Sequence, residues 1–127
     1  MATRRKSINE TEWDLLEVLW ARERGTAREI AEELMEKRAW AVSTVKTMLD
    51  RMVPKGLVNA RQVGNVWEYT PGLLRGDARR SAWTDFVGKA FGGAAAPALH
   101  FLATEAKLSK KELASLRALL DKKGDKR

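Results

Sequence analysis

The sequence predicts a mainly α fold, in which three short helices precede a β-hairpin and three more helices follow it. Two observations support this prediction. Apolar residues recur at helical spacing before residue 54 and after residue 72, whereas β-prone residues surround a Gly-Asn pair in between. A chain of 127 residues, 44% of them hydrophobic, allows one compact domain or a small domain with an appendage.

The first predicted helix covers residues 8–22. Asn9 and Glu12 have the spacing of a capping box, in which each side chain accepts a hydrogen bond from the backbone of the other residue. Gly25 is expected to end the helix, because glycine is favoured just past a helix C-terminus. The apolar stripe is expected to contain Trp13, Leu15, Leu16, Leu19 and Trp20.

The second predicted helix covers residues 26–38. Thr26 and Glu29 repeat the capping-box spacing, so this helix is expected to begin directly after Thr26. Several glutamates on its other side are typical of a face that lies in solvent. Its buried face is expected to consist of Ile30, Ala31 and Leu34.

The stretch WAVSTVKTMLDRMVPKGLV, residues 40–58, predicts a third helix with an unusual outer face. Its inner arc is apolar, but its outer face carries short hydroxyl side chains where long charged ones are the ordinary choice. Pro54 clashes with a helical carbonyl four residues earlier, so the helix is expected to end or kink near Val53. The inner arc contains Val42, Val45, Leu49 and Met52, and the outer face contains Ser43, Thr44, Thr47, Asp50 and Arg51.

Residues 57–62 and 66–70 predict two strands, because Gly64-Asn65 between them suits a tight hairpin turn. Three helices followed by a hairpin form a winged helix-turn-helix, which is expected to occupy residues 1–71. The tryptophans of this region follow helical or strand periodicity, so we expect them in the core. They are Trp13, Trp20, Trp40 and Trp67.

Residues 72–127 are expected to form a helical dimerisation region. Its three predicted helices carry apolar faces on too few residues to enclose a core of their own. These faces need a partner, and the simplest partner is a second copy of the same chain. The residues expected to mediate dimerisation are Trp83, Phe86, Phe91, Leu113, Leu116 and Leu120.

The chain is basic, with a formal net charge of +7 and a pI near 10.0. Residues 10–36 hold nine acids and three bases, whereas residues 37–61 hold six bases and one acid. The positive charge is therefore concentrated around the third predicted helix, which favours an anionic partner such as double-stranded DNA. The basic residues 4–6 either form an arm over the DNA backbone or remain a disordered tail.

The residues give little support for an enzyme. The chain has no cysteine, a single histidine, and no Gly-rich phosphate loop or nucleophile motif. His100 lies in an apolar segment and is expected to be packed or partly exposed, so we expect no catalytic site, metal or cofactor. No apolar run is long enough to span a bilayer and no secretory signal is present, so we expect a cytoplasmic protein without a membrane partner.

The hydroxyl-rich face of the third helix suits the DNA major groove. Ser43, Thr44 and Thr47 are short enough for close approach and can hydrogen-bond to base edges. The alternative is that they are simply exposed to solvent. Arg51 and Lys55 suit phosphates, which fix the register of a protein on DNA but carry no sequence information.

Three further residues complete the expected DNA-contacting set. Lys46 can reach a guanine edge or the backbone, and Asn65 can reach the minor groove from the hairpin tip. Arg61 either contacts phosphate or is an ordinary solvated strand residue. Asp50 repels phosphate unless it pairs with Arg51 or Lys46 or accepts from a cytosine amino group, and the sequence leaves these alternatives open.

Several segments together carry a family resemblance that covers nearly the whole chain. They are INETEWDLLEVLW, TAREIAEEL, WAVSTVKTMLDRMVPKGLV, VWEYTP, FGG and LSKKELASLRALLDKK. They resemble the penicillinase-repressor family (BlaI/MecI) of winged-helix transcriptional repressors. The resemblance implies a homodimer that binds an inverted-repeat operator through a recognition helix in the major groove. It also implies that Thr44 and Thr47 face bases and that Arg51 contacts the backbone.

The resemblance also bears on regulation. The best-known members of the family are inactivated by a sensor-controlled protease at an Asn-Phe bond. The matching pair here is His100-Phe101, which keeps the phenylalanine but not the asparagine, so proteolytic induction at this bond is an expectation from the resemblance alone. Ala41, Ser43 and Asn65 also depart from the family pattern, which indicates weaker phosphate anchoring or a different operator.

Two other classes of function remain open on the sequence. One is a protein-interaction adaptor built on a winged-helix scaffold, and the other is a ligand-sensing regulator with a pocket near Trp83, His100 and Phe101. The operator sequence, the regulated genes and the inducing signal do not follow from the residues.

Overall fold

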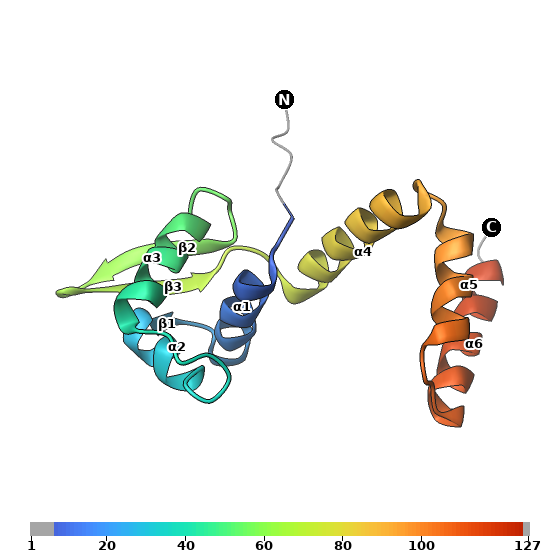
Figure 1. Cartoon of the computed structure of the whole chain (residues 1–127), viewed down its shortest axis with the longest axis horizontal. Coiled ribbons are helices and arrows are strands. Elements are labelled where there is room, and N and C mark those ends of the chain that lie inside the picture. The colour runs from blue at the N-terminus through green and yellow to red at the C-terminus, as the bar shows by residue number, and fades with distance from the viewer. Residues whose placement is uncertain (1–6, 126–127) are drawn as a thin grey trace. The chain divides into compact units, whose positions relative to one another are not determined.

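The computed structural model describes residues 7–125 and confirms a mainly helical fold that contains a winged helix (Figure 1). The chain divides into two compact units, one ending at Asp85 and the other beginning at Phe86. The first unit contains α1 (Glu10–Arg22), β1 (Gly25–Thr26), α2 (Ala27–Glu33), α3 (Val42–Met52), β2 (Val58–Val63) and β3 (Val66–Pro71). The other helices are α4 (Arg75–Phe91), which belongs to both units, α5 (Ala95–Glu105) and α6 (Lys110–Asp125).

The predicted capping boxes are present at the starts of α1 and α2. Asn9 Oδ1 accepts a hydrogen bond from the N–H of Glu12 at 2.9 Å, and Glu12 Oε1 accepts one from the N–H of Asn9 at 3.0 Å. Thr26 and Glu29 make the same reciprocal pair at 3.2 and 2.9 Å. Each box satisfies two backbone donors that the helix itself leaves unpaired, which is why the helices begin at these positions.

The predicted role of Gly25 at the end of α1 is wrong. Glu23 takes the left-handed conformation that ends the helix, with φ at 76°, and its N–H donates to the carbonyl of Leu19 at 2.7 Å. Gly25 instead starts β1, where it pairs with Tyr69. The extended backbone needed for this pairing means that the chain must turn before Gly25 rather than at it.

The second helix is also shorter than predicted, because α2 ends at Glu33 and residues 34–37 form a turn. Asp14 lies opposite this turn and accepts hydrogen bonds from Lys37 at 2.9 Å and Arg38 at 2.8 Å. These two charged bonds hold the turn against α1. They also set the path of the chain into α3.

β1, β3 and β2 form an antiparallel sheet in that order. Gly64-Asn65 joins β2 to β3 as predicted, and Gly64 has the positive φ of 63° that this turn requires. Val63 and Val66 pair beside the turn. The turn end of the hairpin extends beyond α3 (Figure 1). β1 was not predicted, because two residues are too few to produce an alternating pattern.

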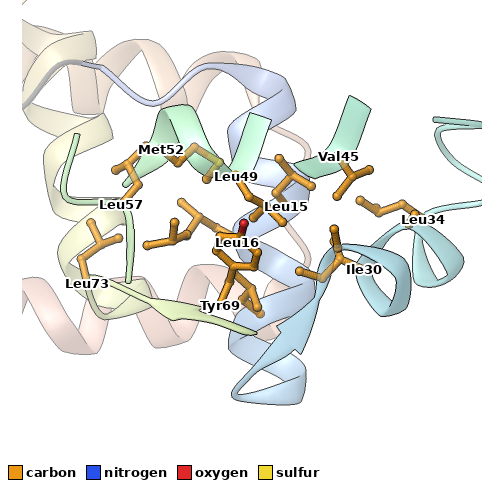
Figure 2. Packing of buried hydrophobic residues seen from close by; sticks show 14 of the residues in the cluster. Leu15, Leu16, Ile30, Leu34, Val45, Leu49, Met52, Leu57, Tyr69 and Leu73 are labelled. Atoms are coloured by element: carbon orange, nitrogen blue, oxygen red, sulfur yellow. The ribbon is translucent and has the colours of Figure 1, made fainter. Parts of the chain in front are cut away.

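The core of the first unit lies between the inner faces of α1, α2 and α3 and the sheet (Figure 2). Trp67 was predicted in this core but is 42% exposed. It shares a face of β3 with the fully buried Tyr69, but it lies two residues nearer the hairpin turn. The other predicted tryptophans, Trp13, Trp20 and Trp40, are partly buried against the core. The fully buried residues include Leu15, Leu16, Leu19, Ile30, Val45, Leu49, Met52, Leu57 and Val58.

The first turns of α4 and the segment before them also pack on this core. Leu73 and Ala78 are buried with the core residues, and the indole N–H of Trp20 donates to the carbonyl of Leu73 at 3.0 Å. Arg75 forms an ion pair with Glu17 of α1 at 2.9 Å. These contacts explain why the first compact unit extends past Pro71, where the sequence placed the end of the winged helix-turn-helix.

In the second unit, Phe91 lies between two other phenylalanines. Its ring centroid is 5.5 Å from that of Phe86 and 5.9 Å from that of Phe101. Ser109 and Glu112 form the predicted capping box at the start of α6, with bonds of 2.9 and 3.1 Å. Within residues 7–125, no helix combines the length and the apolar character needed to cross a membrane.

Candidate nucleic-acid interface

The outer face of α3 is polar and accessible. Val45 and Leu49 on the opposite side of the helix are completely buried, so the rotation of α3 about its axis is fixed by the core. This rotation turns the predicted base-contacting face outward. The exposed residues of α3 include Ser43, Thr44, Thr47 and Arg51.

The start of α3 has no side-chain cap. The N-cap residue is Ala41, whose methyl group cannot accept a hydrogen bond from the first turn. Unpaired N–H groups at a helix start suit an anionic partner such as a phosphate oxygen. Thr47 Oγ1 donates to the backbone carbonyl of Ser43 at 3.0 Å, which leaves the lone pairs of this hydroxyl available as acceptors.

Arg51 is exposed and has no acidic partner within ion-pair distance in the described part of the chain. Its position in the last turn of α3 leaves its charge available to a ligand. The basic residues 4–6, expected to form either an arm over DNA or a tail, lie outside the described residues.

Lys46, Asp50 and Tyr69 form a closed hydrogen-bonded triangle between α3 and β3. The hydroxyl of Tyr69 donates to Asp50 Oδ1 at 2.6 Å, and Lys46 Nζ donates to Asp50 Oδ2 at 2.8 Å. Lys46 Nζ also donates to the Tyr69 hydroxyl at 3.1 Å. In the described chain Asp50 therefore pairs with Lys46 and not with Arg51. Sequence reasoning missed Tyr69 as the third member, although the four-residue spacing of Lys46 and Asp50 already favoured their pairing.

The triangle keeps each of its groups in one protonation state near neutral pH. Burial raises the pKa of Asp50, but the hydrogen bonds from Lys46 and Tyr69 outweigh it and hold the pKa below its usual value of 3.8. The hydrogen bond to Asp50 raises the pKa of Lys46. Burial, followed by the bond to Asp50, raises the pKa of Tyr69, so its hydroxyl remains a donor.

Lys55 is turned inward, toward α1. Its Nζ lies 2.5 Å from Oε2 of Glu12, the carboxylate that also forms the capping box of α1. The side chain of Lys55 is 30% exposed and that of Glu12 only 6%. The ammonium group is therefore already paired in the free protein.

The hairpin carries two of the residues predicted to contact DNA, one in its turn and one bonded to a glutamate of the neighbouring strand. Asn65 lies exposed in the turn. Arg61 is exposed as well, but its guanidinium makes two hydrogen bonds to Glu68 Oε1 across the strands, at 3.0 and 3.1 Å. Oε2 of Glu68 also lies 4.0 Å from Nε of Arg24, so this carboxylate is shared between two cations.

The predicted dimerisation residues lie on α4 and α6. The leucines of α6 are open to solvent in the single chain, with Leu113 44%, Leu116 36% and Leu120 52% exposed. Phe86 is 38% exposed, and Trp83 and Phe91 are partly buried.

The predicted cleavage pair lies within α5. His100 and Phe101 are both exposed, but the bond between them has helical backbone. Among the described residues, no three His, Cys, Asp or Glu side chains are grouped in a way that could hold a metal ion.

Comparison with known proteins shows which family this chain resembles. The model of a family described as Penicillinase repressor matches residues 8–122. The methicillin resistance regulatory protein MecI of Mammaliicoccus sciuri is 27% identical over 117 residues, which cover 91% of this chain and 94% of MecI. The penicillinase repressor of Bacillus licheniformis is 28% identical over 115 residues, covering 90% and 89% of the two chains. The solution structure of the DNA-binding domain of the repressor BlaI is 29% identical, with a TM-score of 0.51, and the match covers 60% of this chain and 93% of that domain.

Proposed function

The chain belongs to the penicillinase repressor family, and we propose that it is a homodimeric transcriptional repressor that binds an inverted-repeat operator in double-stranded DNA. In this proposal α3 enters the major groove and the hairpin contacts the flanking backbone or minor groove. Repression of this kind requires binding alone, so the proposal includes no catalytic step and no cofactor.

One observation carries the proposal: the hydroxyl face of α3 is exposed while its apolar face is locked in the core. Ser43, Thr44 and Thr47 lie on the exposed face, where short side chains let a helix approach base edges closely. Arg51 at the end of the same helix has an exposed charge suited to phosphate. A helix that served only the core would not need a face of this composition.

The exposed leucines of α6 support the homodimer. Leu113, Leu116 and Leu120 recur at helical spacing, and a face of this kind is stabilised when a second copy covers it. Two recognition helices related by a two-fold axis match an inverted repeat, with half-sites about 10 bp apart or a multiple of this distance. Cleavage of the His100-Phe101 bond by a sensor-controlled protease remains a proposal that rests on the family resemblance.

The proposed function can be tested by selection from a pool of random-sequence DNA duplexes with the full-length protein. The expected result is enrichment of an inverted repeat whose half-sites have the spacing given above. A protein-interaction adaptor with an incidental basic patch would retain duplexes without enriching any sequence, and that result would overturn the proposal.

A further inference from the structure

Asp50 places a negative charge on the side of the molecule that, in the proposed function, faces DNA phosphates. An isolated carboxylate in this position weakens binding through repulsion. The carboxylate of Asp50 is not isolated, however, because each of its oxygens accepts a hydrogen bond, one from Tyr69 and one from Lys46. Its effect on a ligand must therefore be considered together with these two partners.

The geometry of the triangle is set by the core. Tyr69 is completely buried, and its position is fixed by the pairing of β3 with both neighbouring strands. The side chains of Asp50 and Lys46 are 50% and 41% exposed. The tyrosine hydroxyl thus orients Asp50, and Asp50 holds the ammonium group of Lys46, which also lies 5.8 Å from the centre of the tyrosine ring. An exposed lysine with four flexible bonds acquires a defined position by this route.

We propose that Asp50 is a positioning residue that withholds Lys46 from DNA phosphate and thereby limits sequence-independent binding. The inference rests on the proposed function. A lysine that contacts phosphate strengthens binding to every sequence and releases a counterion, so it raises affinity without adding discrimination. While Lys46 is paired with Asp50 and Tyr69, it contributes no such contact. Recognition then depends more strongly on the hydroxyl face of α3.

The proposal differs from direct repulsion in one measurable respect. If Asp50 acts through Lys46, its removal matters only while Lys46 is present. If Asp50 simply repels phosphate, its removal has the same effect with or without Lys46. A cycle of Asp50→Asn, Lys46→Met and the double variant separates these two mechanisms.

The full-length proteins should be titrated with two fluorescent duplexes between 50 and 200 mM salt. One duplex is the sequence most enriched by the wild-type protein, and the other is a scrambled sequence of the same length and composition. Asp50→Asn is expected to steepen the dependence of log Kd on log salt by about 0.9 on both duplexes, which corresponds to about a 3.5-fold larger loss of affinity over this range. In the Lys46→Met background the same change is expected to have no effect on the slope.

Three further variants serve as controls. Tyr69→Phe removes only the orienting hydroxyl and is expected to shift the slope in the same direction as Asp50→Asn. Asp50→Glu retains the charge and is expected to keep the wild-type slope. Glu36→Gln changes the charge by the same amount at an exposed position beyond α2, and it is expected to leave the slope unchanged. Thermal unfolding of each variant confirms that the slopes are compared between folded proteins.

The outcomes distinguish the inference from the proposed function on which it rests. If Asp50→Asn steepens the salt slope equally with and without Lys46, or does not steepen it at all, the inference is overturned while DNA binding stands. Loss of affinity of Asp50→Asn for the enriched duplex alone also overturns it, because that result assigns Asp50 to a base contact. If the wild-type protein binds neither duplex, the proposed function itself fails.

Discussion

Lys55 Nζ lies 2.5 Å from Glu12 Oε2, so the turn that follows α3 is tied to the first turn of α1. Glu12 is almost fully buried, and its other oxygen accepts the hydrogen bond that caps α1. A single carboxylate therefore joins the start of the first helix to the end of the third. This pairing gives Lys55 a role in the free protein, whatever it contacts in a complex.

The first prediction concerns the stability contributed by this pair. Lys55→Met leaves the buried carboxylate of Glu12 without its cation and is expected to lower the free energy of unfolding by about 1–3 kcal/mol, the cost of leaving a buried acceptor unpaired. Lys37→Met is the matched control, because its partner Asp14 keeps the bond from Arg38. The control is expected to lose less than about 1 kcal/mol. Urea denaturation of both variants measures the difference, and equal losses would contradict the structural role of Lys55.

The second prediction concerns the outer face of α3. Thr47→Ala is expected to reduce the preference for the enriched duplex over scrambled DNA, because in the proposed function this hydroxyl contacts a base. Arg51→Ala is expected to weaken binding to all duplexes alike and to flatten the salt slope by about one unit, because its charge suits phosphate. Fluorescence titration at several salt concentrations measures both quantities. Unchanged preference and slope in the two variants would remove these residues from the interface.

The third prediction concerns the dimer. Leu116→Asp and Leu120→Asp place charges on the apolar face of α6 and are expected to produce monomers in sedimentation velocity. Ala118→Asp is the matched control, because the period of the helix puts residue 118 roughly opposite these leucines. The control is expected to remain dimeric. A dimer that survives both leucine substitutions would show that another surface holds the two chains together.

The fourth prediction concerns the dependence of stability on pH at Asp14. Burial raises the pKa of this carboxyl, but the hydrogen bonds and charges of Lys37 and Arg38 outweigh burial and hold the pKa below its usual value of 3.8. A pKa that is lower in the folded than in the unfolded chain stabilises the fold above that usual value, and the contribution is lost as the pH falls through the folded value.

Asp14→Asn should therefore destabilise the protein by about 1.5–3 kcal/mol at pH 7, the range for a hydrogen bond to a charged group. The difference from the wild-type protein should shrink as the pH falls below 3.8. Urea denaturation at neutral and acidic pH measures this change. A difference that stays constant with pH would show that the carboxylate charge of Asp14 does not stabilise the fold.

Local patterns in the sequence were sufficient to predict most of the elements. Three capping boxes, the Gly64-Asn65 turn and the effect of Pro54 on α3 each depend on residues within a few positions of one another, and all are present. Three residues of the predicted apolar arc of α3, Val45, Leu49 and Met52, are buried and Val42 is partly buried, because helical spacing decides which residues share a face. The same spacing placed Ser43, Thr44 and Thr47 together on the opposite side.

Only the tertiary structure decided which polar residues are paired between different elements. Lys55 contacts Glu12 from 43 positions away, and Tyr69 joins Lys46 and Asp50 from β3, the central strand of the sheet. Trp67 is exposed although its strand position puts it on the same face as the buried Tyr69. Spacing along the chain determines which side of a helix or strand a residue occupies, but charge pairing depends on which elements meet in space. The sequence by itself thus determined most of the elements and their faces, and the packing of the elements determined which charges remain available to a ligand.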